Sequence, residues 1–520
     1  PRPPGPPLGR RLLGAAALVF AGNVVSRLLG LVRDPVMAQF FGRNSHTDAF
    51  VGAQSLSTVV YDFLVSGLVS AALIPTLSRL ASKEDRSEFW RVGNAVMTLG
   101  VIVLAAVVGV LMLLAPQLVQ VMSGGYDSAT LVLETQLARL MIPTVFLMGM
   151  SAVAMSILYS LHRYRLPALA IACVNAGVIG GMLLLHRLGI VSAAAGLLAG
   201  AAAQLALEIV ALARARMPFR PRFEWRHPEV RRIGQLYLPV AASVVITGAV
   251  TVLERHLYSL NGAGSLSASN YATRLLQVPL GLVSTAISMA ILPTISRYAD
   301  GADWPAYRRI VGAGLKVSVL LTLPVLVGLT ILAGPAIDLL FRHGAFTPSD
   351  AAATTLAFRL YAPQLPFVAV DQLLIYAFYA RHDTRTPTAV AFVTAVIWAI
   401  AAFVGLQLTD WRALVLANSI QNCAHAVILF TLLWRKEPAM AHEGLGSSFG
   451  RGCVAALVMA VACLAVAGAM TRALGSGKAV DLLLLLVAGG GSGLVYLGLL
   501  LLWNGDEANL VRRTLRRQVA

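Results

Sequence analysis

The chain has 520 residues, of which 58% are hydrophobic and 12% are charged, and its formal net charge at pH 7 is +17. A soluble domain averages about 25% charged residues, so this composition excludes a set of soluble domains, each of which needs a polar surface. It is typical of a polytopic membrane protein, in which basic loops on one membrane face produce a large positive charge. We therefore attribute the charge to membrane orientation and expect no nucleic-acid partner.

Apolar segments long enough to cross a bilayer recur along the whole chain. A spanning helix needs about 20 apolar residues. Fourteen spans are predicted, at 14–42, 47–78, 92–114, 130–160, 166–186, 190–213, 234–260, 266–296, 310–333, 351–380, 387–408, 412–434, 452–471 and 481–503. The tails and every second loop hold 28 basic residues, and the opposite loops hold 6. By the positive-inside rule, both termini are expected in the cytoplasm.

The sequence repeats itself at an offset of about 220 residues. LYSLHRYRLP at 158–167 aligns with FYARHDTRTP at 378–387, and the Arg-Leu-x-x-Pro that starts at Arg139 recurs at Arg359. Each repeat holds six spans, an even number, so both copies have the same orientation in the membrane, as in parallel-repeat transporters. We expect an all-α protein with two six-helix lobes around a central cavity and two further helices at the C-terminal side.

The predicted spans and loops divide the chain into six parts. They are a basic cytoplasmic tail at 1–13, an N-lobe at 14–216, a basic cytoplasmic linker at 217–233, a C-lobe at 234–435, two C-terminal helices at 436–504 and a second basic cytoplasmic tail at 505–520. GSGKA at 475–479 lacks the leading Gly and the Ser or Thr after Lys that a phosphate-binding loop requires. We expect no enzyme activity.

Charged residues interrupt the first predicted span. Arg27 and Asp34 share one helix face, and Arg33 lies on its flank. A charged side chain at membrane depth is costly and looks into protein or water rather than lipid. One interpretation is a buried Arg–Asp pair that holds this span to a neighbour, and the other is a cationic cavity wall. Both interpretations remain open from the sequence.

Two further charged residues lie in predicted spans of the second half. Arg274 has no acidic residue within four positions, and Glu254 is a candidate partner for it across helices. The alternative is that Arg27, Arg33 and Arg274 bind one anion, because a planar guanidinium donates two parallel hydrogen bonds to a phosphate. Glu254 is also the candidate coupling site, since a buried carboxylate binds a cation or a proton.

These motifs as a group resemble the MurJ/MviN family of lipid II flippases, within the multidrug/oligosaccharidyl-lipid/polysaccharide exporter (MOP) superfamily. The resemblance extends from about residue 14 to the end of the twelfth span, and the last two spans match only in hydropathy. Beyond the repeated segments, it rests on SRLLGLVRDPVMAQFFG at 26–42, TDAF at 47–50, YATRLLQVPLG at 271–281 and FRHGAFTPSDA at 341–351.

The resemblance implies a multi-pass protein of the bacterial cytoplasmic (inner) membrane that serves peptidoglycan biosynthesis, cell wall biogenesis and cell shape. Its substrate would be lipid II, an undecaprenyl-diphosphate-linked disaccharide-pentapeptide, moved from the cytoplasmic to the outer leaflet by alternating access. By likeness, Arg27, Arg33 and Arg274 are the cavity arginines, with Asp34 beside them, and Asp48 is also functionally important.

The family likeness also implies partners, a coupling ion and a driving force. The two C-terminal helices would form a groove for the lipid tail, so membrane lipids are expected partners, together with cell-wall synthesis machinery. No cofactor is expected beyond a coupling ion, Na⁺ or H⁺, and the membrane potential is an alternative driving force. Glu254 falls where some family members carry an acidic sodium ligand.

The second predicted span departs from the family pattern. Family members often carry Arg just before a Glu-Gly-Ala sequence, whereas this chain has Tyr61 and Asp62, and Ser66 replaces the Glu. The cavity therefore holds less positive charge than in some relatives. A flippase for another polyprenyl-diphosphate-linked glycan is one alternative function, and a non-transporting scaffold for envelope synthesis is another. A drug or cation antiporter is disfavoured, because a cationic cavity repels cations.

Overall fold

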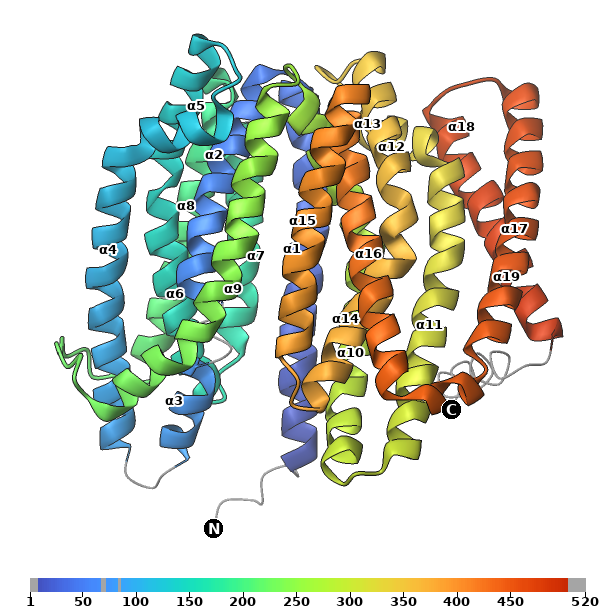
Figure 1. Cartoon of the computed structure of the whole chain (residues 1–520). Coiled ribbons are helices and arrows are strands. Elements are labelled where there is room, and N and C mark those ends of the chain that lie inside the picture. Colours follow the sequence, from blue (N-terminus) through green and yellow to red (C-terminus); the bar gives the residue numbers. More distant parts are fainter. Residues whose placement is uncertain (1–7, 67–71, 83–85, 504–520) are drawn as a thin grey trace. The chain divides into compact units, whose positions relative to one another are not determined.

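The computed structural model describes residues 8–66, 72–82 and 86–503, and all regular structure among them is helical (Figure 1). The predicted all-α membrane class is therefore confirmed. The predicted tails lie largely outside the described residues, which exclude 1–7 and 504–520. Contacts divide the chain into two compact units: unit 1 is Pro1–Ser267 with Gly344–Phe346, and unit 2 is Ala268–His343 with Thr347–Ala520.

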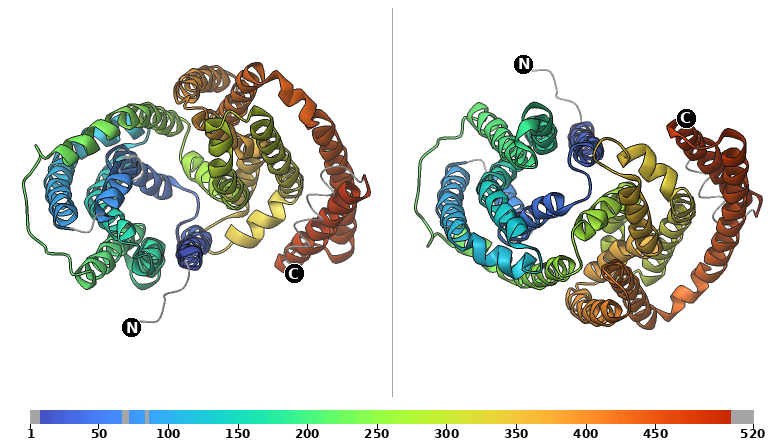
Figure 2. Two further views of the ribbon diagram at one scale, coloured as in Figure 1. Left: turned by 90° about the horizontal axis from the view of Figure 1, so that it is seen from below. Right: turned by 90° about the horizontal axis from the view of Figure 1, so that it is seen from above.

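Unit 1 is a bundle in which α7 packs between α1 and α8, and α4 packs against α6 and α9. Figure 2 shows these helices side by side in blue to green, seen along their axes. Its helices are α1 (Leu8–Phe41), α2 (Ser45–Tyr61), the π-helix η1 (Asp62–Ser66), α3 (Ile74–Ala81), α4 (Ser87–Ser123), α5 (Ser128–Met141), α6 (Pro143–Ser160), α7 (Arg165–Leu184), the 3₁₀-helix η3 (His186–Leu188), α8 (Val191–Arg214) and α9 (Pro228–Ser259). The long helix α10 (Ser265–Asp300) begins in unit 1 and continues into unit 2.

Unit 2 is a second bundle, in which α11 packs against α14 and α17, and α16 packs against α14 and α15. Its helices are α11 (Trp304–Ile331), α12 (Ala333–Phe341), α13 (Pro348–Tyr361), the 3₁₀-helix η4 (Ala362–Gln364), α14 (Leu365–Ala380), α15 (Arg385–Leu408), α16 (Arg412–Lys436), the 3₁₀-helix η5 (Pro438–Glu443), α17 (Leu445–Leu474), α18 (Lys478–Leu483), the π-helix η6 (Leu484–Gly489) and α19 (Gly490–Leu502). The two C-terminal helices α17 and α19 pair and pack on α11, where the Tyr496 hydroxyl donates to the Leu320 carbonyl at 2.9 Å.

Each of the fourteen predicted spans contains helix, but several are broken or longer than predicted. Within the described residues, nine helical segments are long and apolar enough to cross a membrane. The predicted span 130–160 is divided at Pro143, which begins α6 and cannot donate the hydrogen bond that would continue α5. The predicted span 47–78 changes from α-helix to π-helix at Asp62. The nine-residue helix α12 lies in a segment that was predicted as a loop.

The internal repeat is visible in the backbone. His162 and His382, which the sequence alignment pairs, both have φ of 57°. In each copy this histidine follows the last turn of a helix, and its amide bonds to the carbonyl of the tyrosine three residues earlier, at 2.9 Å. Such a left-handed residue is uncommon outside glycine, so a shared φ at aligned positions supports one ancestral turn.

Helices α7 and α8 make the closest helix pair in unit 1, because four glycines face one another. A Cβ on Gly177 would lie 2.5 Å from the Gly200 Cα, and a Cβ on Gly181 would lie 2.6 Å from the Gly196 Cα. Both helices thus carry a Gly-x-x-x-Gly pair, the spacing that lets helix backbones approach closely in membranes. These contacts lie in the second half of α7 and the first half of α8.

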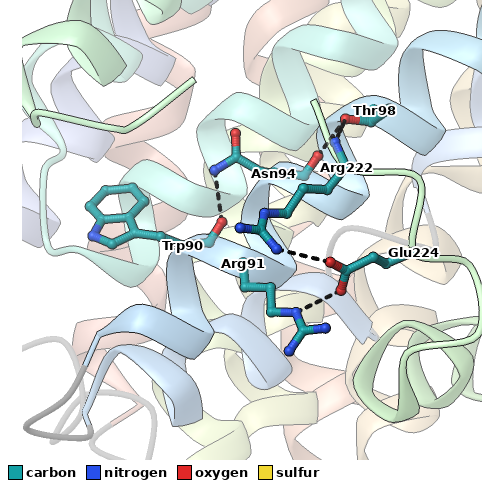
Figure 3. A network of polar contacts seen from close by, with 6 residues as sticks. All are labelled: Trp90, Arg91, Asn94, Thr98, Arg222 and Glu224. Atoms are coloured by element: carbon teal, nitrogen blue, oxygen red, sulfur yellow. Dashed lines mark hydrogen bonds and ion pairs between the residues drawn. The ribbon is translucent and has the colours of Figure 1, made fainter. Parts of the chain in front are cut away.

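The basic segment predicted as a linker is hydrogen-bonded to α4 (Figure 3). Asn94 donates to the Pro218 carbonyl and accepts from the Arg220 amide, and Thr98 accepts from the Arg222 amide. Glu224 pairs with both Arg91 and Arg222. The hydrogen bond from Arg91 is the main reason why the pKa of Glu224 is lowered, which keeps this carboxylate charged. The segment before α9 is therefore ordered rather than a loose connector.

Candidate substrate-binding and coupling residues

Arg33 and Asp34 form an ion pair on α1. The Arg33 Nε and Nη2 both donate to Asp34 Oδ1, at 2.9 and 2.7 Å, and Nη1 donates to the Asn175 side chain on α7 at 3.1 Å. Asn175 in turn donates to the Ser26 carbonyl at 3.0 Å. The structure therefore shows the pair that holds the first span to a neighbour, and it identifies α7 as that neighbour.

Arg27 lies two turns before Asp34 on α1, but it does not pair with it. Its side chain is exposed in unit 1, and within the described residues it makes no hydrogen bond or ion pair. An arginine at membrane depth that lacks a protein partner must meet water, a ligand or another protein surface, because contact with lipid tails is too costly. Arg27 thus has no counter-charge among the described residues, whereas Arg33 is paired with Asp34.

Asp48 is fully buried in the first turn of α2 and binds the start of α10. Its carboxylate accepts hydrogen bonds from the Gly264 amide at 2.6 Å, from the Ser267 amide at 2.7 Å and from the Tyr126 hydroxyl at 3.1 Å. The first amides of a helix lack partners inside the helix and favour negative charge. Asp48 therefore caps α10, and its predicted role in contacting substrate remains a prediction.

A second buried carboxylate, Glu134 on α5, lies in the same region and was not identified from the sequence. It accepts from Ser123 at 2.8 Å, and its Oε1 would be 2.3 Å from a Cβ on Gly52 of α2. Burial, and then the charge and hydrogen bond of Asp48, raise the pKa of Tyr126, so its hydroxyl stays a donor. Arg255 of α9 acts on Tyr126 and Glu134 electrostatically, and its Nε is buried without a hydrogen bond. The sequence signal was the one acidic residue of α5, which also carries threonine, glutamine and arginine.

The other two predicted residues belong to different units. Glu254 is half-buried on α9 of unit 1 and has no hydrogen bond or ion pair among the described residues. Arg274 is half-buried on α10 of unit 2. The predicted meeting of Arg274 with Arg27 and Arg33, and the alternative pairing with Glu254, therefore stay predictions.

In unit 2, polar side chains of η4, α14 and α16 form hydrogen bonds with one another. Asp371 on α14 accepts a hydrogen bond from His425 on α16 at 2.6 Å. Asn422 donates to Gln364 at 2.7 Å and to Asn418 at 3.1 Å. Asp371 thus joins two helices. Within the residues that the structure describes, no group of three or more His, Cys, Asp or Glu side chains could hold a metal ion.

The departure from the family pattern coincides with a change of backbone geometry. Tyr61 ends α2, and Asp62 begins the π-helix that runs to Ser66. π-Helical turns are rare and frequently occur at functional sites. Glu208 of α8 lies within electrostatic range of Tyr61, so this part of unit 1 gathers acidic rather than basic groups.

An all-helical chain with apolar helices of spanning length and charged side chains kept along them defines a polytopic membrane protein of the transporter class. A two-bundle fold of this kind is shared by a solved MATE-family multidrug transporter of the MOP superfamily, with 14% identity, a TM-score of 0.70, and coverage of 80% of this chain and 96% of that one. The chain belongs to the MurJ family, since the family model described as lipid II flippase MurJ matches residues 37–487.

Individual relatives agree with this assignment. A probable lipid II flippase MurJ of Bdellovibrio bacteriovorus is 29% identical over 446 residues, which cover 83% of this chain and 84% of that protein. A solved lipid II flippase MurJ in an inward closed conformation has 22% identity and a TM-score of 0.78, with coverage of 94% of this chain and 98% of that one. The resemblance inferred from the sequence motifs is confirmed.

Proposed function

We propose that the protein moves lipid II from the cytoplasmic to the outer leaflet of the bacterial inner membrane, as the names of its relatives state for them. The observation that carries the proposal is the family match, which covers residues 37–487 and so includes helices of both units. The alternating-access cycle and a contribution to cell-wall synthesis follow from the same membership. The distribution of basic residues supports a cytoplasmic location for both termini.

We propose that Arg27, Arg33 and Arg274 bind the diphosphate of the lipid. A diphosphate ester carries about two negative charges near neutral pH, and a single arginine would leave it under-neutralised at low dielectric. Arg27, which has no partner among the described residues, supports this role most directly. Asp34 then acts as a positioning residue, because one of its carboxylate oxygens accepts hydrogen bonds from two nitrogens of Arg33.

Glu254 is the proposed coupling residue, with Na⁺ or H⁺ as its ion. Its carboxylate lies on α9 and has no hydrogen bond or ion pair within the described part of the chain. A bound cation would give this carboxylate the partner that it lacks. Glu254→Gln is expected to weaken ion-dependent transport while binding of the diphosphate headgroup is kept. Transport with unchanged ion dependence in this variant would remove Glu254 from the mechanism.

One observation favours a second candidate function. Tyr61, Asp62 and Ser66 replace the Arg and Glu often found on the second span in the family, and they lie where the helix becomes π-helical. A region with less positive charge suits a headgroup with less negative charge. Transport of another polyprenyl-diphosphate-linked glycan is therefore the alternative, with the same arginines on the diphosphate.

Complementation distinguishes these functions. A bacterium depleted of its own lipid II flippase should regain growth and normal cell shape when it expresses this chain. The same chain in liposomes should move labelled lipid II between leaflets. Rescue without flipping would indicate a scaffold, and flipping of other diphosphate-linked glycans in preference to lipid II would indicate the second candidate.

A further inference from the structure

A basic pocket lies where α7 begins and α8 ends. It has a volume of about 350 Å³, and basic and aromatic side chains line it: His162, Arg163, Tyr164, Arg165 and Arg214. Its walls are the first turn of α7 with the loop before it, and the last turn of α8. The pocket lies wholly in unit 1.

The positive charge of this pocket is not neutralised within the described residues. Arg163 Nη1 donates to the Arg214 carbonyl at 2.9 Å, which satisfies a carbonyl at the end of α8 but leaves the guanidinium charge intact. Neither Arg165 nor Arg214 pairs with a carboxylate in the part of the chain that the structure describes. No side chain caps the first amides of α7, and such amides also favour an anion.

The repeat provides an internal comparison. The aligned loop of unit 2 has the same backbone, with φ of 57° at His382 as at His162. There, however, Arg381 pairs with Glu437, Lys436 pairs with Asp383, and His382 lies 3.2 Å from Asp300. Hydrogen bonds from Lys436 and Thr386 outweigh the effect of burial and lower the pKa of Asp383 to about 2. At the position aligned with Arg163, unit 2 carries the acidic Asp383, so its loop holds less positive charge than the loop of unit 1. Arg385, which aligns with Arg165, has no carboxylate partner among the described residues either.

The position of the pocket along α7 and α8 is the one expected of a membrane surface. Both α7 and α8 are candidate spans, so the pocket lies where two spanning helices end. One turn further along α7, Leu169 is 63% exposed, and on α8 Ile209 is 42% exposed. Apolar side chains next to a basic pocket match an acyl chain next to a phosphate. On the orientation proposed above, this surface faces the cytoplasmic leaflet.

We propose that the pocket formed by Arg163, Arg165 and Arg214 between α7 and α8 binds the phosphate headgroup of an anionic phospholipid of the surrounding membrane. Basic pockets between helices at a cytoplasmic membrane face favour such headgroups, and each Arg or Lys near the surface contributes to the attraction. The bound lipid would hold α7 and α8 at the membrane surface. The pocket shares no residue with the arginines proposed for the transported lipid.

The test compares two double variants of the full-length protein that each remove two positive charges. Arg165→Gln/Arg214→Gln removes them from the pocket, whereas Arg385→Gln/Arg435→Gln removes exposed charges from the corresponding ends of α15 and α16 in unit 2. Native mass spectrometry measures the phosphatidylglycerol and the phosphatidylcholine retained by each purified protein. A thermal shift in nanodiscs of either lipid provides a second measurement.

The pocket variant should bind phosphatidylglycerol about tenfold more weakly or worse, and the unit 2 variant should bind as the native protein does. Arg165→Lys/Arg214→Lys, which keeps the charge and guards against a folding defect, should bind better than the Gln pair. Equal loss in both Gln variants, or loss in neither, would overturn the proposal. Displacement of the lipid by millimolar inorganic phosphate alone would also overturn it, because the site would then be one for a soluble anion.

Discussion

Arg33 donates two hydrogen bonds to a single oxygen of Asp34, from Nε at 2.9 Å and from Nη2 at 2.7 Å, although the two residues are adjacent on α1. The side chains are 13% and 12% exposed. The third contact of the guanidinium, with Asn175, joins the pair to α7. An arginine proposed to bind substrate is thus held in place by its own neighbour and by a second helix.

The ion pair between Arg33 and Asp34 predicts how the stability of the protein changes when Asp34 is replaced. Asp34→Asn should lower the free energy of unfolding by about 1.5–3 kcal/mol, because hydrogen bonds to charged groups contribute about that much and Arg33 is left without its counter-charge. Arg33→Met/Asp34→Leu, which removes both charges, should be closer to native stability. Chemical denaturation in detergent measures both. Native stability in Asp34→Asn would show that the pair contributes nothing to the fold.

Asp48→Asn tests the cap on α10. The amide keeps the shape of the side chain but loses the charge that accepts from the Gly264 and Ser267 amides, so these amides should exchange hydrogen faster. We expect a loss of about 1.5–3 kcal/mol in unfolding free energy, since the accepting group is charged and buried. Asp127→Asn, at the exposed start of α5, is the control and should leave exchange at Gly264 unchanged. Native exchange rates in Asp48→Asn would contradict the capping role.

The Asp383–Lys436 contact predicts a pH dependence. Burial opposes ionisation of Asp383, but hydrogen bonds from Lys436 and Thr386 lower its pKa from 3.8 to about 2. A carboxyl whose pKa is lower in the folded state than in the unfolded state stabilises the protein at pH values above the unfolded-state pKa. This stabilisation is lost as the pH falls from 3.8 toward 2. Partial exposure of both side chains limits its size.

The melting temperature should therefore fall less steeply with pH in Lys436→Met than in the native protein, within that acidic window. At pH values above this window, Lys436→Met should be less stable than the native protein by a constant amount. Differential scanning fluorimetry over both ranges measures the difference between the two proteins, which removes the contribution of other carboxylates. Parallel curves through the acidic window would show that Lys436 does not lower the pKa of Asp383.

The orientation is tested by cysteine labelling in a background without native cysteines. Phe223 is 64% exposed on the segment before α9, and Ser476 is exposed between α17 and α18. In intact cells, a membrane-impermeant thiol reagent should label Ser476→Cys and not Phe223→Cys. Lysis should make both react. The reverse pattern in intact cells would place both termini outside.

The helical segments could be predicted because a bilayer imposes a minimum apolar length on every span. The same rule missed α12, since nine residues cannot span. The breaks at Pro143 and at the π-helix of Asp62 depend on local backbone hydrogen bonds. Hydropathy does not contain that information, although Tyr61 and Asp62 were noticed as a departure from the family.

The partners of polar residues were the least predictable part of the site. The sequence left two interpretations of the first span open, and the structure shows the Arg–Asp pair, formed by Arg33 and Asp34. Asp48 was indicated only by the family likeness, and its contacts with the start of α10 were not predicted. The roles of Asn175 on α7 and Glu134 on α5 depend on which neighbouring helix each side chain faces. Such contacts arise from tertiary packing, so a helix taken alone cannot reveal them.

The most direct measurement is lipid II flipping by Arg27→Ala, Arg33→Ala and Arg274→Ala in liposomes at matched protein amounts. Each lost charge-assisted hydrogen bond is worth about 1.5–3 kcal/mol, and 1.4 kcal/mol is about tenfold in affinity. Each Ala variant should therefore bind the diphosphate about tenfold more weakly or worse and nearly lose transport. Each Lys variant should keep part of it, because it keeps the charge but not the planar fork. Normal flipping by all three Ala variants would contradict the account and would leave these arginines a purely structural role.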